Sequence, residues 1–545
     1  MTSISDETNK EKIERKSKKN IALGTIFGYL AIAVSLVYGF FITPMIIKSV
    51  GDQNYGLYSL STSIINLFLM DFGLGQTIST KLAKLRAAND KQGVERFLAG
   101  IFKMYLMVDA IFVAVIIGLF FATPYAFKSS YEGEQLITLQ YLFLIVGGYS
   151  LISLPSSVFN GVIGTYEKFG MIKVFDIIQK LAYLGLSLLS IFLGWGIIGI
   201  VCVNVASGLF AIALRFLYMR AYLKIRLDLR KSITKTERKD VLSFSGWGFI
   251  IVLCTRLLVT ITPFILASVS DAFAVTIFGL VATIESYVYM FGEVFSGFFM
   301  AKIARTEAEG TEEEKKAHLQ ALIEKIGKLQ FFIIGLILAG FVSVGFEFVQ
   351  VWMREEGWNY HIFLRIYMCI IVVCAHHIID LPQIPIKNAM YLHNHIKPLA
   401  ISQIVKAAIN VGLSFWLSSQ PGTFGGALGA CLSILTANAI GLIVDNFMYK
   451  KYLGISMGHY FAKTFGTGSI TFAITCAVGL GLHFFMPLDH HMVIKLLIDG
   501  VAVTVVFFVC SIFITFNKEE RANYLRIVAE LLHIKKKAPK AVEKK

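Results

Sequence analysis

Long runs of apolar residues, separated by short polar segments, fill most of the sequence. In lipid, a helix of about 20 such residues crosses the hydrocarbon core and satisfies its own backbone. The pattern predicts about fourteen membrane-spanning helices, at 21–47, 55–80, 97–123, 136–161, 169–193, 197–222, 241–268, 272–301, 326–352, 361–388, 396–418, 425–449, 465–486 and 491–516. The second has the weakest signal, because it is rich in Ser, Thr and Gly around Asp71.

The basic residues predict how these helices are oriented. If the N-terminus is cytoplasmic, 41 Lys and Arg fall in cytoplasmic segments and three, Lys48, Lys128 and Arg354, in the opposite loops. Because cytoplasmic loops of membrane proteins are enriched in Lys and Arg, we expect both termini in the cytoplasm. The same bias accounts for the net charge of +15 without a nucleic-acid partner.

The composition agrees with an all-α polytopic membrane protein and excludes a water-soluble enzyme. Apolar residues make up 56% of the chain and charged residues 16%, whereas soluble proteins carry roughly 25% charged residues. A soluble globule could not cover so much apolar surface. The seven cysteines lie inside apolar stretches and show no disulfide or metal-ligand spacing.

The sequence contains an internal repeat. Residues 42–52 (ITPMIIKSVGD) and 261–271 (ITPFILASVSD) are identical at seven of eleven positions, and the Leu-Pro pairs at 154–155 and 381–382 recur at nearly the same offset. A unit of six spans is even, so two units share one orientation and enclose a cleft between them. We therefore expect two parallel six-helix repeats followed by two further helices.

This layout divides the chain into six parts. The loops are too short to hold a folded catalytic domain, and the last segment resembles an amphipathic helix lying beside anionic lipid. The parts are a basic cytoplasmic tail (1–20), an N-terminal six-helix bundle (21–222), a cytoplasmic linker (223–240), a C-terminal six-helix bundle (241–450), two additional transmembrane helices (451–516) and an amphipathic basic cytoplasmic tail (517–545).

One region carries a family resemblance. TPMIIKSVGDQNYGLYSL at 43–60, followed by DFGLGQTIST at 71–80, resembles the polysaccharide transporter family of lipid-linked oligosaccharide flippases. That family belongs to the multidrug/oligosaccharidyl-lipid/polysaccharide exporter superfamily. The resemblance implies a protein of the bacterial inner membrane that flips an undecaprenyl-diphosphate-linked oligosaccharide, the repeat unit of an O-antigen, a capsule or an exopolysaccharide. It also implies that glycan polymerases or glycosyltransferases are partners.

Three basic residues at membrane depth are candidates for binding an anionic headgroup. Arg256 lies near the middle of the seventh predicted span, and Lys180 and Lys406 occupy matching places in the fifth and eleventh. A charge inside a membrane is costly and is a functional candidate by default. Alternatively, Lys180 pairs with Asp176, four residues earlier. Arg215 lies nearer a span end, where its side chain can snorkel to the interface.

Acidic and histidine residues inside the spans are candidates for ion or proton coupling. His376 and Asp380 lie one helical turn apart, with His377 beside them, and such a pair can titrate near neutral pH. Asp71, Glu285 and Glu293 are further candidates. For each of these residues a structural hydrogen-bonded role is the alternative.

Two other functions stay open. A cation-coupled small-molecule exporter of the same superfamily has a similar pattern of spans, although fourteen spans favour a flippase over it. A membrane glycosyltransferase or polymerase is a weaker alternative. The sequence has no Asp-x-Asp pair, no P-loop and no Gly-x-Ser-x-Gly motif, so we expect neither catalysis nor a cofactor.

Overall fold

The computed structural model describes 27–68, 82, 85, 88, 90–166, 168–294, 311–354, 358–485, 492–518 and 520–522. Every regular element in these residues is a helix, and thirteen helices are long and apolar enough to cross a membrane. They coincide with thirteen of the predicted spans. The second predicted span is described only as far as residue 68, where it forms α3 (Asp52–Phe68). The prediction of an all-helical, multi-pass membrane protein is confirmed.

The N-lobe contains the helices before residue 222. Its first helix spans Phe27–Val50, and a π-helix, η1, interrupts it at Tyr38–Ile42. The other elements of the N-lobe are α2 (Thr43–Val50), α3, α5 (Lys91–Ala126), α6 (Glu134–Ser156), α7 (Val158–Thr165), α8 (Phe169–Phe192) and α9 (Gly196–Ala221).

The C-lobe runs from α10 to α19. Two of its helices begin with capping boxes, in which Thr234 pairs with Glu237 and Thr311 with Glu314. Its elements are α10 (Lys235–Thr260), α11 (Thr262–Val269), α12 (Ala272–Val294), α14 (Glu312–Trp352), α15 (Tyr360–Ala375), α16 (His377–Asp380), α17 (Ile384–Leu392), α18 (Ile396–Ser418) and α19 (Gly426–Leu453).

In both copies of the repeated segment a Thr-Pro pair opens a short α-helix, α2 or α11. The preceding residues differ: the π-helix η1 leads into α2, whereas α10 ends at Thr260 and one turn residue, Ile261, precedes α11. Proline is tolerated there because the first turn of a helix needs no N–H partner. The Leu-Pro pairs also coincide with breaks, before α7 and before α17. The parallel arrangement of the two units as a whole remains a prediction.

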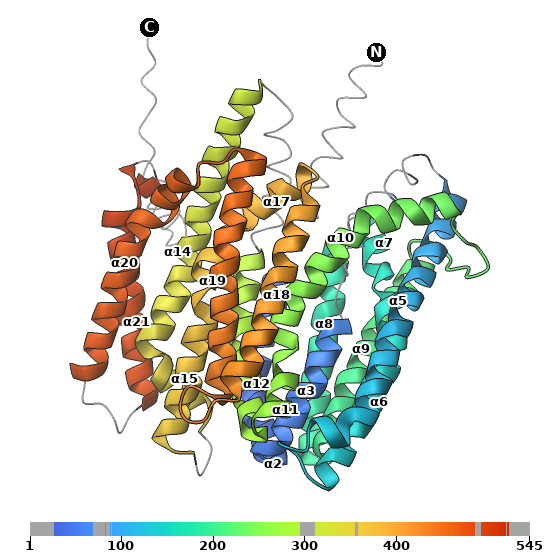
Figure 1. Cartoon of the computed structure of the whole chain (residues 1–545), viewed down its shortest axis with the longest axis horizontal. Coiled ribbons are helices and arrows are strands. Elements are labelled where there is room, and N and C mark those ends of the chain that lie inside the picture. Colours follow the sequence, from blue (N-terminus) through green and yellow to red (C-terminus); the bar gives the residue numbers. More distant parts are fainter. Residues whose placement is uncertain are drawn as a thin grey trace.

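The largest cluster of buried hydrophobic side chains joins the two lobes. One cluster of buried side chains combines both lobes near α2, α3, α11 and α12. Ser129 of the N-lobe donates there to the carbonyls of Ala267 (3.1 Å) and Ser268 (3.0 Å). Two smaller clusters lie apart from it. One joins the N-lobe to the start of α10, where Arg96 of α5 also lies 3.3 Å from Glu237, and the other lies within the C-lobe. Figure 1 shows α2 and α11 together at one end of the molecule, and α7 and α17 at the opposite end.

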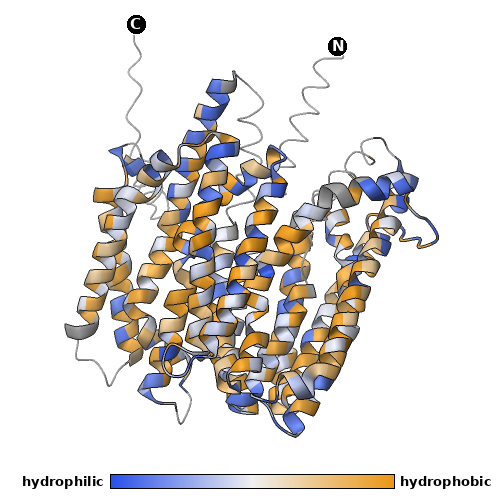
Figure 2. Ribbon diagram, in the orientation of Figure 1, coloured by the Kyte–Doolittle hydropathy of each residue, from blue (hydrophilic) through white to orange (hydrophobic). Residues whose placement is uncertain are grey.

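Large apolar side chains cover the outside of the helices. Figure 2 shows hydrophobic colour along the length of the helices and hydrophilic colour gathered at their ends. Side chains such as Met107, Phe192 and Ile443 are more than 60% exposed, which is tolerated where the solvent is lipid.

The two additional helices, α20 (Met457–Phe485) and α21 (Met492–Cys510) with the π-helix η3 (Ser511–Thr515), pack on α14. Their contact contains a buried ion pair between Lys495 and Glu347, 3.5 Å apart. The hydropathy pattern predicts this pair of helices, but it gave no reason to expect charges at their contact.

The orientation predicts which ends can be labelled from outside. A cysteine replacing exposed Gln420, in the loop before α19, should react with a membrane-impermeant maleimide in intact cells. A cysteine replacing exposed Lys235, at the start of α10, should react only after permeabilisation. External labelling at position 235 would reverse the orientation deduced from the basic residues.

Candidate functional site

A polar stripe on α8 faces the inside of the N-lobe. Asp176, Lys180, Tyr183 and Ser187 follow at intervals of four, three and four residues, which places them on one side of a helix. The hydroxyl of Tyr183 lies 2.7 Å from that of Tyr58 on α3. The stripe therefore points toward the first helix and α3.

Asp176 does not pair with Lys180. Its carboxylate accepts from Arg215 of α9 at 2.6 Å and lies 3.5 Å from Lys173. Arg215 is only 9% exposed, so the prediction that it snorkels to the interface is wrong. Its charge stays inside the lobe because Asp176 neutralises it there.

Lys180 instead holds the first helix. Its ammonium donates to the carbonyl of Ala31 at 3.0 Å and to the hydroxyl of Ser35. Among the residues that the structure describes, no carboxylate forms an ion pair with it. Lys180 is thus a partly buried cation that forms no direct ion pair within the described residues, although Asp176 lies near enough to act on its charge.

Arg256 lies on α10 at a comparable depth. Its side chain is exposed, and its guanidinium carbon lies 5.9 Å from the centre of the Tyr289 ring. No ion pair joins it to any residue within the described ranges. Tyr287, two residues from Tyr289 on α12, donates to the carbonyl of Ser35 at 2.8 Å. Both cations are thus connected to α12, Lys180 through Ser35 to Tyr287 and Arg256 directly to Tyr289. The two tyrosines are two positions apart and therefore point to roughly opposite sides of the helix.

Lys406 has a different environment. It is 2% exposed, and its ammonium donates to Asp445 of α19 at 2.6 Å, while Ser402 donates to the same carboxylate. The stem of Lys406 lies so close to α19 that a Cβ at Gly441 would be 1.9 Å from it. A glycine is required there for the two helices to enclose the lysine. In this conformation Lys406 is not accessible to a ligand.

In each lobe an ion pair thus joins the fifth and sixth spans. The acidic residue is on the fifth span in the N-lobe and on the sixth span in the C-lobe. In the N-lobe Asp176 on α8 pairs with Arg215 on α9; in the C-lobe Lys406 on α18 pairs with Asp445 on α19. Both pairs join residues 39 positions apart. This correspondence indicates that both pairs hold two helices of a lobe together.

His376 and Asp380, predicted as a pair, form no direct side-chain hydrogen bond with each other in the described residues, while Asp380 and His377 each have another partner. Asp380 accepts from Lys387 at 2.7 Å, and His377 lies 2.7 Å from Glu285 of α12. α15 ends at Ala375, so His376 is at a break and not inside a continuous helix. His376 and Asp380 both line a cavity of about 100 Å³ against α19.

Two of the predicted coupling residues cannot be placed. Asp71 lies outside the described residues. Glu293 belongs to α12, but its side chain is not among those described. Of the five coupling candidates, the structure therefore places His376, Asp380 and Glu285. Glu285 lies 2.7 Å from His377, whose ring centre is 4.0 Å from that of His376.

Sequence reasoning also missed several residues of this region. The sequence did not point to Lys387, to His377 as the partner of Glu285, or to Trp352 at the contact between the lobes. Trp352 is 3% exposed and donates to the Gly39 carbonyl at 3.0 Å. A signal was available only for Lys387, which follows Asp380 by two helical turns.

Comparison with known proteins decides the family. Residues 19–298 match the family model described as "Polysaccharide biosynthesis protein". The chain belongs to this family. No curated protein matches the sequence significantly.

Solved structures of other membrane proteins share the fold of this chain. The lipid II flippase MurJ, in an inward closed conformation, superposes with a TM-score of 0.66 at 14% identity, over 90% of this chain and 98% of that one. An inward-facing MATE-family multidrug resistance transporter of the MOP superfamily has a TM-score of 0.59 at 14% identity, over 81% and 99%. An outward-facing MATE transporter has a TM-score of 0.56 at 17% identity, over 80% and 96%. The family member therefore has the fold of membrane flippases and transporters.

Proposed function

We propose that the protein flips an undecaprenyl-diphosphate-linked oligosaccharide from the cytoplasmic to the outer leaflet of the bacterial inner membrane. The observation that supports this most is a pair of cations that form no ion pair with any described residue, Lys180 in the N-lobe and Arg256 in the C-lobe. A cation without a counter-charge is costly at membrane depth, so both residues need water or an anion beside them. A diphosphate that passes between the lobes supplies that anion.

The two cations suit different parts of a diphosphate. The guanidinium of Arg256 can form two parallel hydrogen bonds to phosphate oxygens, and the ring of Tyr289 supports its plane. The ammonium of Lys180, already held by Ser35 and Ala31, contributes a point charge. Lys406 is left out of the proposed site because Asp445 neutralises it.

Transport requires the contact between the lobes to open. The shared core and the hydrogen bonds from Ser129 close one end, which is the outer end if the termini are cytoplasmic. Rocking of the lobes would break these contacts and expose the cations to the other leaflet. Without an ATP-binding motif, the energy comes from an ion gradient, the membrane potential or consumption of the product outside.

The test is leaflet-resolved accumulation of the substrate. Depleting the protein should cause lipid-linked oligosaccharide to accumulate in the cytoplasmic leaflet, and re-expression of the wild type should clear it. An unchanged distribution across the leaflets after depletion would contradict the proposal.

A second candidate, cation-coupled export of a small molecule, is favoured by the buried His377–Glu285 pair. A proton relay through this pair would make transport depend on pH. His377→Gln should flatten the pH profile of transport in proteoliposomes. His459→Gln is a matched control, because His459 pairs with Glu324 at 2.7 Å but is largely exposed. A pH profile that His377→Gln leaves intact would identify the pair as structural.

A further inference from the structure

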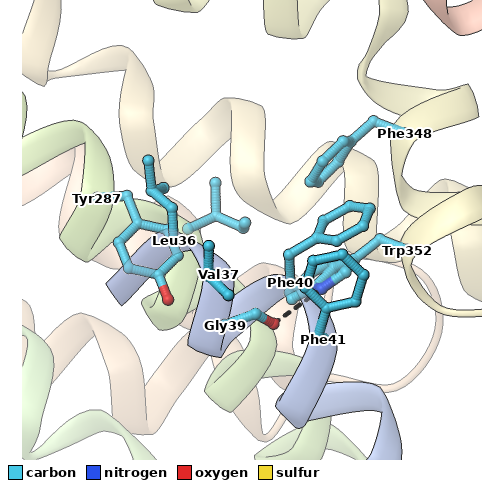
Figure 3. A pocket seen from close by; sticks show the side chains of 9 residues that line it. Leu36, Val37, Gly39, Phe40, Phe41, Tyr287, Phe348 and Trp352 are labelled. Atoms are coloured by element: carbon cyan, nitrogen blue, oxygen red, sulfur yellow. Dashed lines mark hydrogen bonds between the residues drawn. The ribbon is translucent and has the colours of Figure 1, made fainter. Parts of the chain in front are cut away.

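An apolar cavity of about 320 Å³ lies where the first helix meets α12 and α14 of the C-lobe. Its volume falls within the range of roughly 300–1,000 Å³ for small-molecule sites. Figure 3 shows Tyr287 and Val37 on one side of it, and Phe40, Phe348 and Trp352 on the other. Val37 is 48% exposed and Phe40 37% exposed, so the cavity is open on the side of the first helix.

The backbone of the first helix explains why the cavity is there. In the i→i−5 hydrogen bonding of a π-helix, the partner of the Gly39 carbonyl would be residue 44, which is a proline and has no N–H. Trp352 donates to that carbonyl instead, at 3.0 Å. A Cβ on Gly39 would lie 1.8 Å from the hydroxyl of Tyr287, so only glycine lets that ring lie across the helix. The π-helix η1 and the two aromatic donors, Trp352 and Tyr287, together hold the cavity open.

The cavity lies next to one of the two cations. Tyr287, which lines it, donates to the carbonyl of Ser35, and the hydroxyl of the same serine accepts from Lys180. A single residue, Ser35, thus separates the positive charge of Lys180 from an apolar space. This combination matches an amphipathic ligand with an anionic head and an apolar chain.

We infer that this cavity binds the prenyl chain of a phosphate-bearing polyprenyl lipid, in the part of the chain nearest the phosphate. The inference rests on the proposed function. Three aromatic side chains that line the cavity, Phe40, Phe348 and Trp352, pack against one another at centroid distances of 6.0 and 5.7 Å. The branched methyl groups of a prenyl chain make more contact with such ring faces than an unbranched acyl chain does. The ammonium of Lys180 supplies the counter-charge for the phosphate.

Photo-crosslinking of the full-length protein in nanodiscs tests the inference. One probe is a polyprenyl phosphate with a diazirine in an isoprene unit near the phosphate; the other is a phosphatidylglycerol with a diazirine in its acyl chain. The polyprenyl probe should label peptides containing 36–41 or 348–352, identified by mass spectrometry.

Filling the cavity should remove this labelling. Val37→Trp should reduce it at least about tenfold, since excluding two methylene equivalents from an apolar site already has about that effect. Val115→Trp is the matched control, because Val115 is a 54% exposed valine on α5 that does not line the cavity. Lys180→Gln should also weaken labelling by the polyprenyl phosphate.

The outcomes separate this inference from the proposed function. The prenyl site would be overturned if the polyprenyl probe labelled Val37→Trp and Val115→Trp equally. It would also be overturned if the acyl probe labelled the cavity as strongly as the polyprenyl probe and Val37→Trp blocked both. Either result would stand even if glycan export were intact. Selective loss of polyprenyl labelling in Val37→Trp would uphold the site, even if depletion shows that the protein moves no glycan.

Discussion

Replacing Arg256 by alanine should abolish glycan export while the protein still inserts into the membrane at a normal level. Arg256 is exposed and makes no ion pair with a described residue, so its loss leaves no buried partner unsatisfied. In the repeat its counterpart is Val37, 219 positions earlier, so the shared fold does not require a charge there. Truncating one partner of a desolvated charge pair costs about 2–5 kcal/mol, which corresponds to a loss of roughly 30-fold or more in affinity.

Arg256→Lys should retain part of the activity. The charge persists, but the planar fork that can hold two phosphate oxygens is lost. Arg365→Ala is the matched control, because Arg365 is also exposed but lies near the start of α15. Export would be measured as leaflet-resolved substrate in cells depleted of the wild-type protein. Full export by the alanine variant, at normal expression, would remove Arg256 from the site.

The membrane spans and the helix breaks could be predicted from the sequence because they depend on local properties. An apolar run of sufficient length becomes a helix in lipid whatever its neighbours are. Proline is favoured in the first turn of a helix and disfavoured in its interior, so the Thr-Pro pairs at 43–44 and 262–263 mark helix starts in both lobes. These features need no knowledge of which helices are adjacent.

The partners of the buried charges could not be predicted in this way. Asp176 was expected near Lys180 because four residues separate them on one helix, but Arg215, on the next helix, takes its carboxylate. Similarly, helical spacing suggested His376 with Asp380, and a break at His376 directs Asp380 to Lys387. Pairing between helices depends on how each helix is rotated about its axis and on how far its side chains reach. The periodicity of one helix gives no information on either.

The correspondence between the two lobes changes the interpretation of Lys406. Sequence spacing grouped it with Lys180, because the repeat aligns the fifth and eleventh spans. The structure shows instead that it corresponds to Asp176 as a member of an ion pair with the following span. A charge at membrane depth therefore has two explanations, a ligand or a helix partner, and only the neighbouring helix distinguishes them.

Removing the Lys406 ammonium should destabilise the protein strongly. Lys406→Met leaves Asp445, which is 1% exposed, as an unpaired charge between α18 and α19. Breaking a buried ion pair in this way costs about 3–5 kcal/mol. The expected results are a large drop in the melting temperature of the purified protein, measured by intrinsic fluorescence, and reduced expression.

Two comparisons make this result specific. Lys406→Met with Asp445→Leu should recover much of the stability, since an apolar pair of similar volume removes the buried charge altogether. Arg215→Met should be milder than Lys406→Met, because Asp176 is 27% exposed and keeps Lys173 at 3.5 Å. If Lys406→Met instead melted like the wild type but lost glycan export, Lys406 would have to leave Asp445 during transport and contact the substrate. Its role as a fixed link between α18 and α19 would then be wrong.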